Sequence, residues 1–175
     1  LKTGKEGRRT GLGFTALADM VAALGYKYDS DESIEFIENM MREKCRAEFD
    51  CSIDMSLERG SFIGFNKEIE DTSEFVQMLK IDLPEVYERM MKFGRRNISI
   101  STVAPTGTLS MLAQTSSGIE PVFMTDYKRR RKLNEQDTEE KVDFIDDMGD
   151  KWQEFTVYHH NLKEWMNITG ETDTT

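Results

Sequence analysis

The stretch that most constrains the fold is residues 98–121, ISISTVAPTGTLSMLAQTSSGIEP, because its hydrophobic period changes partway along. Ile98 and Ile100 alternate with serines, which is the two-residue period of a strand with two unlike faces. Pro105 stops that pattern, and leucines then return at helical spacing. Residues 97–121 are therefore predicted to form a strand, a tight turn and a short helix.

The turn at the start of this short helix is a candidate anion site. The first backbone N–H groups of a helix have no partner within it, and the aligned peptide dipoles add partial positive charge there. Hydroxyls at Thr106, Thr108 and Ser110 could add donors, and Gly107 leaves room for a phosphate oxygen. A hydroxyl-rich capped turn explains the same residues, and spacing alone favours that plainer interpretation. The Gly-Lys-Ser/Thr ending of a Walker loop is absent from the sequence.

The composition limits the partners that the chain can have. Its 175 residues carry a formal net charge of −10, which argues against a general nucleic-acid or membrane-surface binder because both of those partners are anionic. No apolar run approaches the roughly 20 residues of a membrane span. The sequence begins without Met and without the apolar core of a signal peptide. We therefore expect a piece of a longer, cytoplasmic chain.

The cysteines and histidines do not form a recognisable metal or nucleophile motif. Cys45 and Cys51 lie six residues apart in a helical pattern, so they point to different sides, and each is expected to be a small buried or half-buried residue. His159 and His160 are adjacent, which favours surface or packing roles. The sequence therefore predicts no metal site.

Hydrophobic periodicity divides the rest of the chain into elements. Helices are predicted over residues 11–25, 30–58 and 84–94, because apolar residues recur there at steps of three and four. Residues 122–160 are predicted to be an extended, hairpin-like insertion. Its basic run at 129–132 precedes an acidic stretch and is interpreted as one half of a local charge balance.

Several blocks of the sequence, in this order and at these separations, resemble the catalytic subunit of ribonucleotide reductase. They are RRTGLGFTALADMVAALG, SLERGSF, GRRNISISTVAPTGTLSMLAQTSSGIEPVF and YKRRRK. The similarity extends over nearly all 175 residues and is greatest to the adenosylcobalamin-dependent class II form. The resemblance implies a ten-stranded α/β barrel of the kind shared with glycyl-radical enzymes. This chain would be a fragment from the later half of that barrel, helix-rich when taken alone.

The resemblance assigns roles to individual positions. The turn after one barrel strand holds the substrate phosphates in this family, and the matching residues here are Pro105, Thr106, Gly107, Thr108, Leu109 and Ser110. Pro105 would shape the turn, Leu109 would contribute its backbone N–H, and Ser110 is the less certain donor. Structural roles are implied for Arg96, Asn97, Gly118, Glu120 and Pro121, the last three in the SSGIEP motif.

The resemblance also implies the activity of the complete enzyme. That enzyme reduces ribonucleotides to deoxyribonucleotides for DNA replication by thiyl-radical chemistry. Adenosylcobalamin is its cofactor, a thioredoxin- or glutaredoxin-type protein its reductant, and a homodimer its assembly. Neither Cys45 nor Cys51 stands in the family's catalytic cysteine context, so we assign this chain no catalytic residue and expect it to be inactive without the remainder of the catalytic chain.

Three alternatives remain open at this stage. The chain could be a non-catalytic module that binds nucleotides or phosphate, or an inert fragment from a truncated or split gene. Its ragged polar ends favour the fragment over the module. Within the reductase interpretation, a class I radical source would require a tyrosine pair near the C-terminus of the complete protein.

Overall fold

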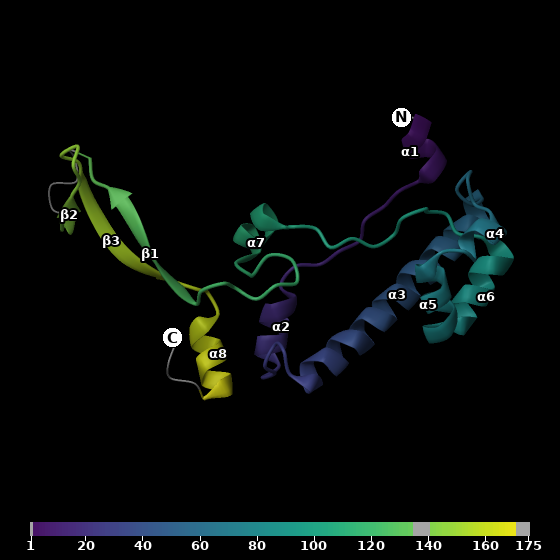
Figure 1. Cartoon of the computed structure of the whole chain (residues 1–175), viewed down its shortest axis with the longest axis horizontal. Coiled ribbons are helices and arrows are strands. Elements are labelled where there is room, and N and C mark those ends of the chain that lie inside the picture. Colours follow the sequence, from purple (N-terminus) through teal and green to yellow (C-terminus); the bar gives the residue numbers. More distant parts are fainter. Residues whose placement is uncertain (1, 135–140, 171–175) are drawn as a thin grey trace. The chain divides into compact units, whose positions relative to one another are not determined.

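The computed structural model describes residues 2–134 and 141–170 as a mixed helix-and-strand chain (Figure 1). It separates into two compact units. The first unit contains Leu1–Phe14 and Lys27–Pro105, and the second contains Thr15–Tyr26 and Thr106–Thr175. Across the described ranges, no helix is both long enough and apolar enough to cross a membrane.

The first unit is organised around one long helix, α3 (Asp31–Arg59). Ser30 caps its start by accepting a hydrogen bond from the Ser33 N–H at 3.3 Å. Gly60, with φ of +77°, ends it. The helix begins and ends within one residue of the range 30–58 that the periodicity predicts.

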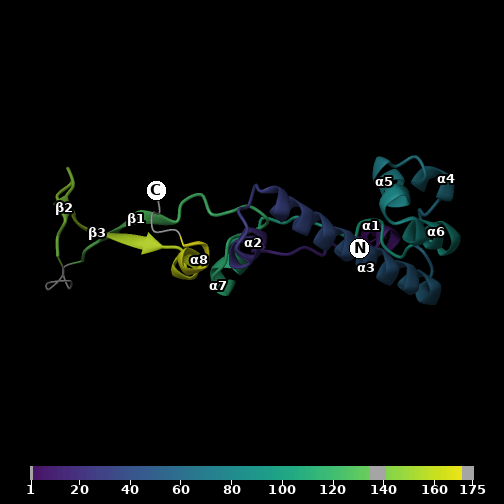
Figure 2. The same ribbon diagram turned by 90° about the horizontal axis from the view of Figure 1, so that it is seen from below.

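Four shorter helices complete the first unit. They are α1 (Lys2–Gly7), α4 (Lys67–Glu70), α5 (Glu74–Asp82) and α6 (Pro84–Phe93). Helices α4, α5 and α6 gather at the C-terminal half of α3 in both views (Figures 1 and 2). Pro84 occupies the first position of α6, where its missing N–H costs no helical hydrogen bond.

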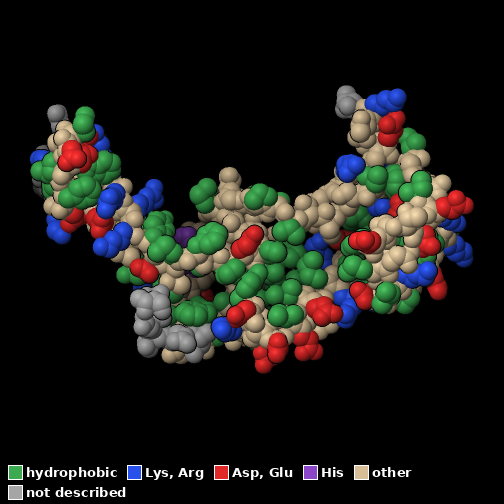
Figure 3. Space-filling view, in the orientation of Figure 1, with side chains coloured by type: hydrophobic (Ala, Val, Ile, Leu, Met, Phe, Trp, Pro, Cys, Tyr) green, Lys and Arg blue, Asp and Glu red, His purple; other side chains and the backbone are tan. Residues whose placement is uncertain are grey.

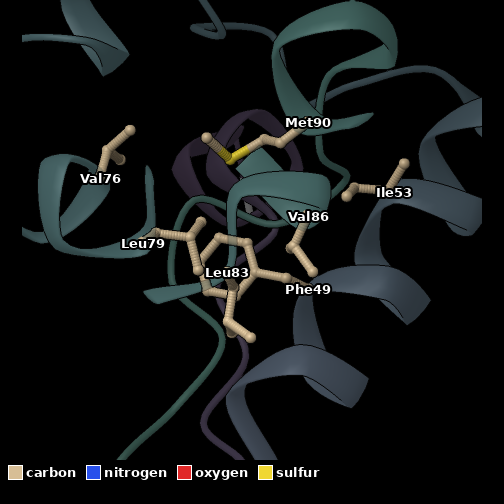
Figure 4. Close-up of a cluster of buried hydrophobic side chains, with 7 residues drawn as sticks. All are labelled: Phe49, Ile53, Val76, Leu79, Leu83, Val86 and Met90. Atoms are coloured by element: carbon tan, nitrogen blue, oxygen red, sulfur yellow. The ribbon is translucent and has the colours of Figure 1, made fainter. Parts of the chain in front are cut away.

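The hydrophobic core of the first unit lies between α3, α5 and α6. Its members are fully or almost fully buried, and each such side chain stabilises the fold by roughly 1.5–3 kcal/mol. Figure 4 shows them as a single cluster: Phe49, Ile53, Val76, Leu79, Leu83, Val86 and Met90.

A buried ion pair borders this core. Arg95, two residues after the end of α6, bonds the carboxylate of Glu70 through Nη2 at 2.9 Å and through Nε at 3.2 Å. Its Nη1 donates to the backbone oxygens of Asn97 and Ile98 at 2.7 and 2.8 Å. The Phe62 ring lies 5.3 Å from the guanidinium carbon. These contacts fix the direction in which the chain leaves α6.

The prediction of a regular strand at residues 98–103 is wrong. The backbone is extended there, but its pairing with residues 7–12 reduces to one parallel bridge, Leu12 with Ser101. The Leu12 N–H donates to Ile100 O at 2.8 Å, and the Thr102 N–H donates to Leu12 O at 3.1 Å. A parallel ladder gains its stability from neighbours on both sides, and within the described ranges this segment has one neighbour.

The predicted helix over residues 11–25 is shortened to α2 (Leu17–Ala23) in the second unit. Ala16 has φ of +66°, a left-handed conformation from which a right-handed helix cannot continue toward the N-terminus. In the first unit, a Cβ on Gly13 would lie 2.7 Å from the Thr102 carbonyl oxygen. That glycine therefore serves the close approach of two backbones.

The second unit combines short helices with an open three-stranded antiparallel sheet. The strands are β1 (Asp126–Lys132), β2 (Phe144–Ile145) and β3 (Lys151–Tyr158), in the order β1-β3-β2. The helices are α2, α7 (Gly107–Ala113) and α8 (Leu162–Thr169). Helix α8 contacts α2.

Basic side chains of β1 pair with acids in β3 and directly before it. Glu154 bonds Lys128 at 3.1 Å and Arg130 at 3.2 Å, and Lys132 pairs with Asp150. Figure 3 shows blue basic and red acidic side chains intermixed over the sheet. Arg130 and Lys132 of the basic run are thus paired with acids. Part of the acidic stretch that follows the run lies outside the described residues, so its role in balancing the run stays a prediction.

Candidate functional site

The site predicted from the sequence lies at the start of α7. Ser110 is the first residue of this turn whose N–H is bonded, donating to Thr106 O at 2.8 Å. Within residues 2–134 and 141–170, the backbone N–H groups of Gly107, Thr108 and Leu109 have no hydrogen-bond partner. All three residues are exposed. The turn therefore presents three consecutive donors outward, the arrangement that binds anions at helix starts.

Gly107 stands in open space. A Cβ added at this position would meet no described atom within 4 Å. Gly107 is not among the glycines with positive φ, so the backbone does not demand glycine either. The contrast is Gly94, where φ is +76° and a Cβ would collide with the Ser61 hydroxyl. The described part of the chain therefore places no steric demand for glycine at position 107.

The three hydroxyls of the turn differ in their hydrogen bonding. Thr106 Oγ1 accepts a hydrogen bond from the Gly118 N–H at 3.0 Å. Ser110 is buried and its hydroxyl donates to Gly107 O at 2.9 Å, so that hydroxyl is directed at its own helix. Thr108 is exposed and makes no side-chain hydrogen bond to the described residues. Thr108 is therefore the hydroxyl best placed to meet a ligand.

The loop after α7 is held by a side chain of α2 and by Thr15, two residues before that helix. Thr15 Oγ1 donates to Ser116 O at 2.7 Å, and Asp19 Oδ2 accepts from the Ser116 N–H at 2.8 Å. His159 Nε2 lies 3.8 Å from the other carboxylate oxygen of Asp19. No sequence signal indicates that these residues meet, because they are distant along the chain and match no local motif.

The SSGIEP motif forms a compact turn in the second unit. Gly118 is buried with φ of +62°, a conformation that favours glycine. The Glu120 carboxylate accepts a hydrogen bond from the Ile119 N–H at 3.2 Å. Pro121 is exposed and ends the turn. These contacts support a structural role for the motif.

Arg96 and Asn97 make structural contacts in the first unit. Arg96 Nη1 donates to the carbonyl oxygens of Arg59 and Gly60, each at 3.0 Å, and so satisfies the C-terminal end of α3. The buried Asn97 side chain accepts from Ser52 Oγ at 2.9 Å and also donates to a backbone carbonyl. Both residues connect α3 to the extended segment that precedes Pro105.

The two cysteines lie on α3 and differ in exposure. Cys45 is half-buried, and that burial, followed by the nearby Glu48 carboxylate, raises the pKa of its thiol. Cys51 is exposed, so the expectation that both cysteines are covered is wrong for Cys51. It lies on the solvent face of the helix between two core-facing positions. The described residues contain no cluster of His, Cys, Asp and Glu that could hold a metal ion.

Comparison with known proteins identifies the class to which this fold and turn belong. The profile of the family described as "Ribonucleotide reductase, barrel domain" matches residues 2–164. The chain therefore belongs to the ribonucleotide reductase barrel-domain family, as its ordered sequence blocks predict.

Individual relatives agree with this assignment. The vitamin B12-dependent ribonucleoside-diphosphate reductase of Mycobacterium tuberculosis is 35% identical over 123 residues, which cover 70% of this chain and 15% of that protein. The protein of the same name from Thermoplasma acidophilum is 30% identical over 173 residues, 98% of this chain and 20% of that protein. The ribonucleoside-diphosphate reductase subunit alpha of Treponema pallidum is 24% identical over 128 residues, covering 71% of this chain and 15% of that protein. The chain thus spans a fifth or less of the length of these relatives.

Proposed function

We propose that this chain is a segment of the catalytic subunit of a ribonucleoside-diphosphate reductase, and that it supplies the turn that holds the substrate's phosphates. The family assignment and the names of the relatives support the reductase activity. The observation that carries the role of the segment is the set of three outward N–H groups beside the open space at Gly107. An ordinary capped turn needs no such space.

Each residue of the turn has a part in this proposal. The N–H groups of Gly107, Thr108 and Leu109 bind phosphate oxygens, and the helix dipole adds to the attraction. Thr108 adds its hydroxyl, and Thr106 sets the start of the helix through its bond to Gly118. Pro105 fixes its own φ directly before the turn. The Ser110 hydroxyl contributes by holding the Gly107 carbonyl.

In this proposal, the segment contributes to the reaction by positioning the substrate. Holding the phosphates fixes where the ribose lies relative to a radical-bearing cysteine on another segment, and such fixation is a large part of the rate of an enzymatic step. Neither Cys45 nor Cys51 takes part in the proposal, and no residue of this chain is assigned a catalytic role. The segment alone is expected to turn over no substrate.

The complete enzyme in this proposal has features that the segment does not itself contain. Its catalytic domain is a ten-stranded α/β barrel, of which residues 1–175 form part of the later half. Adenosylcobalamin supplies the radical when bound, and the B12-dependent names of two relatives support this choice. None of the described residues is assigned to hold cobalamin. The reductant is a thioredoxin- or glutaredoxin-type protein, and the enzyme is a cytoplasmic homodimer.

Equilibrium binding to the reductase that contains this segment tests the proposal. The probes are the four common ribonucleoside diphosphates, each compared with its own nucleoside. Because charge-assisted hydrogen bonds are worth roughly 1.5–3 kcal/mol each, the best-bound diphosphate should bind at least about tenfold more tightly than its nucleoside. Equal affinity would overturn the phosphate role. A reduction assay with adenosylcobalamin tests the activity, since binding without formation of deoxyribonucleotide would support the non-catalytic module.

A further inference from the structure

The loop that follows α7 is held by side chains from a distant part of the sequence, and this arrangement suggests a further functional role. We infer that Asp19 and Thr15 are positioning residues for the proposed phosphate turn, acting through the backbone of Ser116. The inference rests on the proposed function of that turn. It adds two residues that neither the sequence motifs nor the family assignment single out.

Two side chains hold the backbone of Ser116. Both of its backbone polar groups are bonded, the carbonyl by Thr15 Oγ1 at 2.7 Å and the N–H by Asp19 Oδ2 at 2.8 Å. Ser116 is 5% exposed, and the side chain of Asp19 is 13% exposed. Hydrogen bonds to an ionised carboxylate in such surroundings are stronger than those between neutral groups. The position of Ser116 is therefore set by Asp19 of α2 and by Thr15, two residues before that helix.

The loop that contains Ser116 is hydrogen-bonded to the start of the proposed phosphate turn. Two residues further on, the Gly118 N–H donates to Thr106 Oγ1 at 3.0 Å. The Thr115 N–H donates to the carbonyl oxygen of Ser110, in the middle of α7, at 3.0 Å. The loop after α7 is thus bonded to the helix that it follows and to Thr106, the residue before that helix. A shift of Ser116 would be transmitted to Thr106, the residue at which the phosphate turn begins.

The Asp19 carboxylate also lies beside a histidine. Its second oxygen faces His159 Nε2 at 3.8 Å. His159 is fixed by its own backbone, whose N–H donates to Thr125 O at 2.8 Å. The Asn161 N–H donates to His159 Nδ1 at 3.4 Å, which orients the ring. The buried Nε2 therefore faces the carboxylate, but it makes no hydrogen bond to the described residues.

The bonds from Thr15 and Asp19 matter because apolar packing contributes little to holding the loop. The residues between α7 and Gly118, Gln-Thr-Ser-Ser, are small or polar and bury little apolar surface. Ordering such a backbone costs roughly 1–2 kcal/mol per residue. If α2 meets that cost before the ligand arrives, the N–H groups of the turn are already in place for a phosphate.

The test measures phosphate recognition rather than overall binding. In the reductase that contains this segment, the affinity of the best-bound ribonucleoside diphosphate is divided by that of its nucleoside. Asp19→Ala removes the acceptor for the Ser116 N–H and should lower this ratio about tenfold. Asp19→Asn keeps an oxygen acceptor and should recover most of the loss. Asp147→Ala, an exposed acid in the turn between β2 and β3, is the matched control and should leave the ratio unchanged.

A general loss of packing would weaken diphosphate and nucleoside alike, so it would leave the ratio where it was. If the wild-type enzyme does not distinguish the two ligands, the proposed function of the turn fails. If it does distinguish them and Asp19→Ala retains the ratio within about twofold, the positioning role is overturned. If Asp19→Ala does not fold, Thr15→Val is used instead, because it removes one hydroxyl at nearly constant volume. This variant should lower the affinity ratio about threefold. An unchanged ratio would refute the inference.

Discussion

Substitution of Gly107 separates the binding role of the turn from its structural role. A Cβ at this position would meet no described atom within 4 Å, and Gly107 does not require positive φ. Replacing glycine in a helix by alanine stabilises the helix by up to about 1 kcal/mol, and by valine by a few tenths. Gly107→Ala and Gly107→Val should therefore fold at least as stably as the wild type.

The effect on the substrate should be the opposite. The new side chain would occupy the space proposed for a phosphate oxygen and draw it away from the N–H groups. Each lost hydrogen bond to a charged group costs about 1.5–3 kcal/mol, or roughly 10–150-fold in affinity. We expect the KM for the ribonucleoside diphosphate to rise about tenfold with alanine and about a hundredfold with valine, with kcat changed much less.

The assay is steady-state reduction by the complete enzyme, with the thermal unfolding midpoint of each variant measured alongside. Ala113→Val, at the exposed far end of α7, is the matched control and should retain the wild-type KM. A KM for Gly107→Val within about twofold of wild type, with an unchanged unfolding midpoint, would refute the phosphate role. A lowered midpoint would instead contradict the open space that the structure assigns to this position.

Three further predictions concern stability, reactivity and pH. Arg95→Met should lower the free energy of unfolding by about 3–5 kcal/mol, because it leaves a buried carboxylate unpaired; urea unfolding measures this. Cys51 should react with iodoacetamide at least about tenfold faster than Cys45, whose thiol pKa is raised by burial, as mass spectrometry of timed samples would show. The pKa of Asp146 is lowered, mainly by the hydrogen bond that its carboxylate accepts from the Trp152 indole N–H. The stability that this carboxylate contributes is therefore fully present above its unfolded-state pKa of about 3.9 and is lost as the pH falls through the lower pKa of the folded state. The NMR resonance of the Trp152 indole N–H, followed against pH, measures this titration.

Each of these predictions has a control. Replacing Arg95 and Glu70 together by apolar residues should recover much of the lost stability, and a double variant as unstable as Arg95→Met would contradict the ion-pair argument. In urea the two thiols should react at equal rates. With Asp146→Asn the indole resonance should no longer depend on acidic pH, and a persistent dependence would assign it to another group.

Local signals in the sequence account well for the long helix of the first unit. Ser30 as cap, apolar residues at steps of three and four, and Gly60 as terminator all act within a few residues of one another. The same holds for the start of α7, where Pro105 and Gly107 identify the turn. Secondary structure could be predicted at these places because the forces that determine it are local.

Contacts between distant residues could not be predicted in this way. Alternating isoleucines correctly indicate an extended backbone at residues 98–103, but whether that backbone joins a ladder depends on partners ninety positions away. No sequence signal places Ala16 in a left-handed conformation. Arg95 follows a helix and precedes a second arginine, a sequence context that predicts an exposed side chain. It is buried because it pairs with Glu70, which is distant in sequence.

The candidate site also combines local and distant residues. The proposed phosphate turn is contiguous in sequence and carries a recognisable pattern, so the sequence could propose its residues. Asp19, which bonds Ser116 in the loop after α7, and His159 beside it come from positions far before and far after in the chain. Their meeting depends on how the second unit closes, which no pattern of neighbouring residues encodes.

The parallel contact between residues 7–12 and 98–102 also bears on the synthesis of the protein. Residues 7–12 leave the ribosome about ninety residues before their partner segment, which at roughly 5–20 residues per second is an interval of about 5–20 s. Helices α3, α5 and α6 are synthesised within that interval and can pack on one another before the partner segment of residues 7–12 is made. During those seconds the backbone donors and acceptors of residues 7–12 are unpaired and open to other chains. Glycines and charged residues disfavour β-sheet formation between chains. Their presence in GRRTGLG therefore lowers the risk of aggregation while this segment is unpaired.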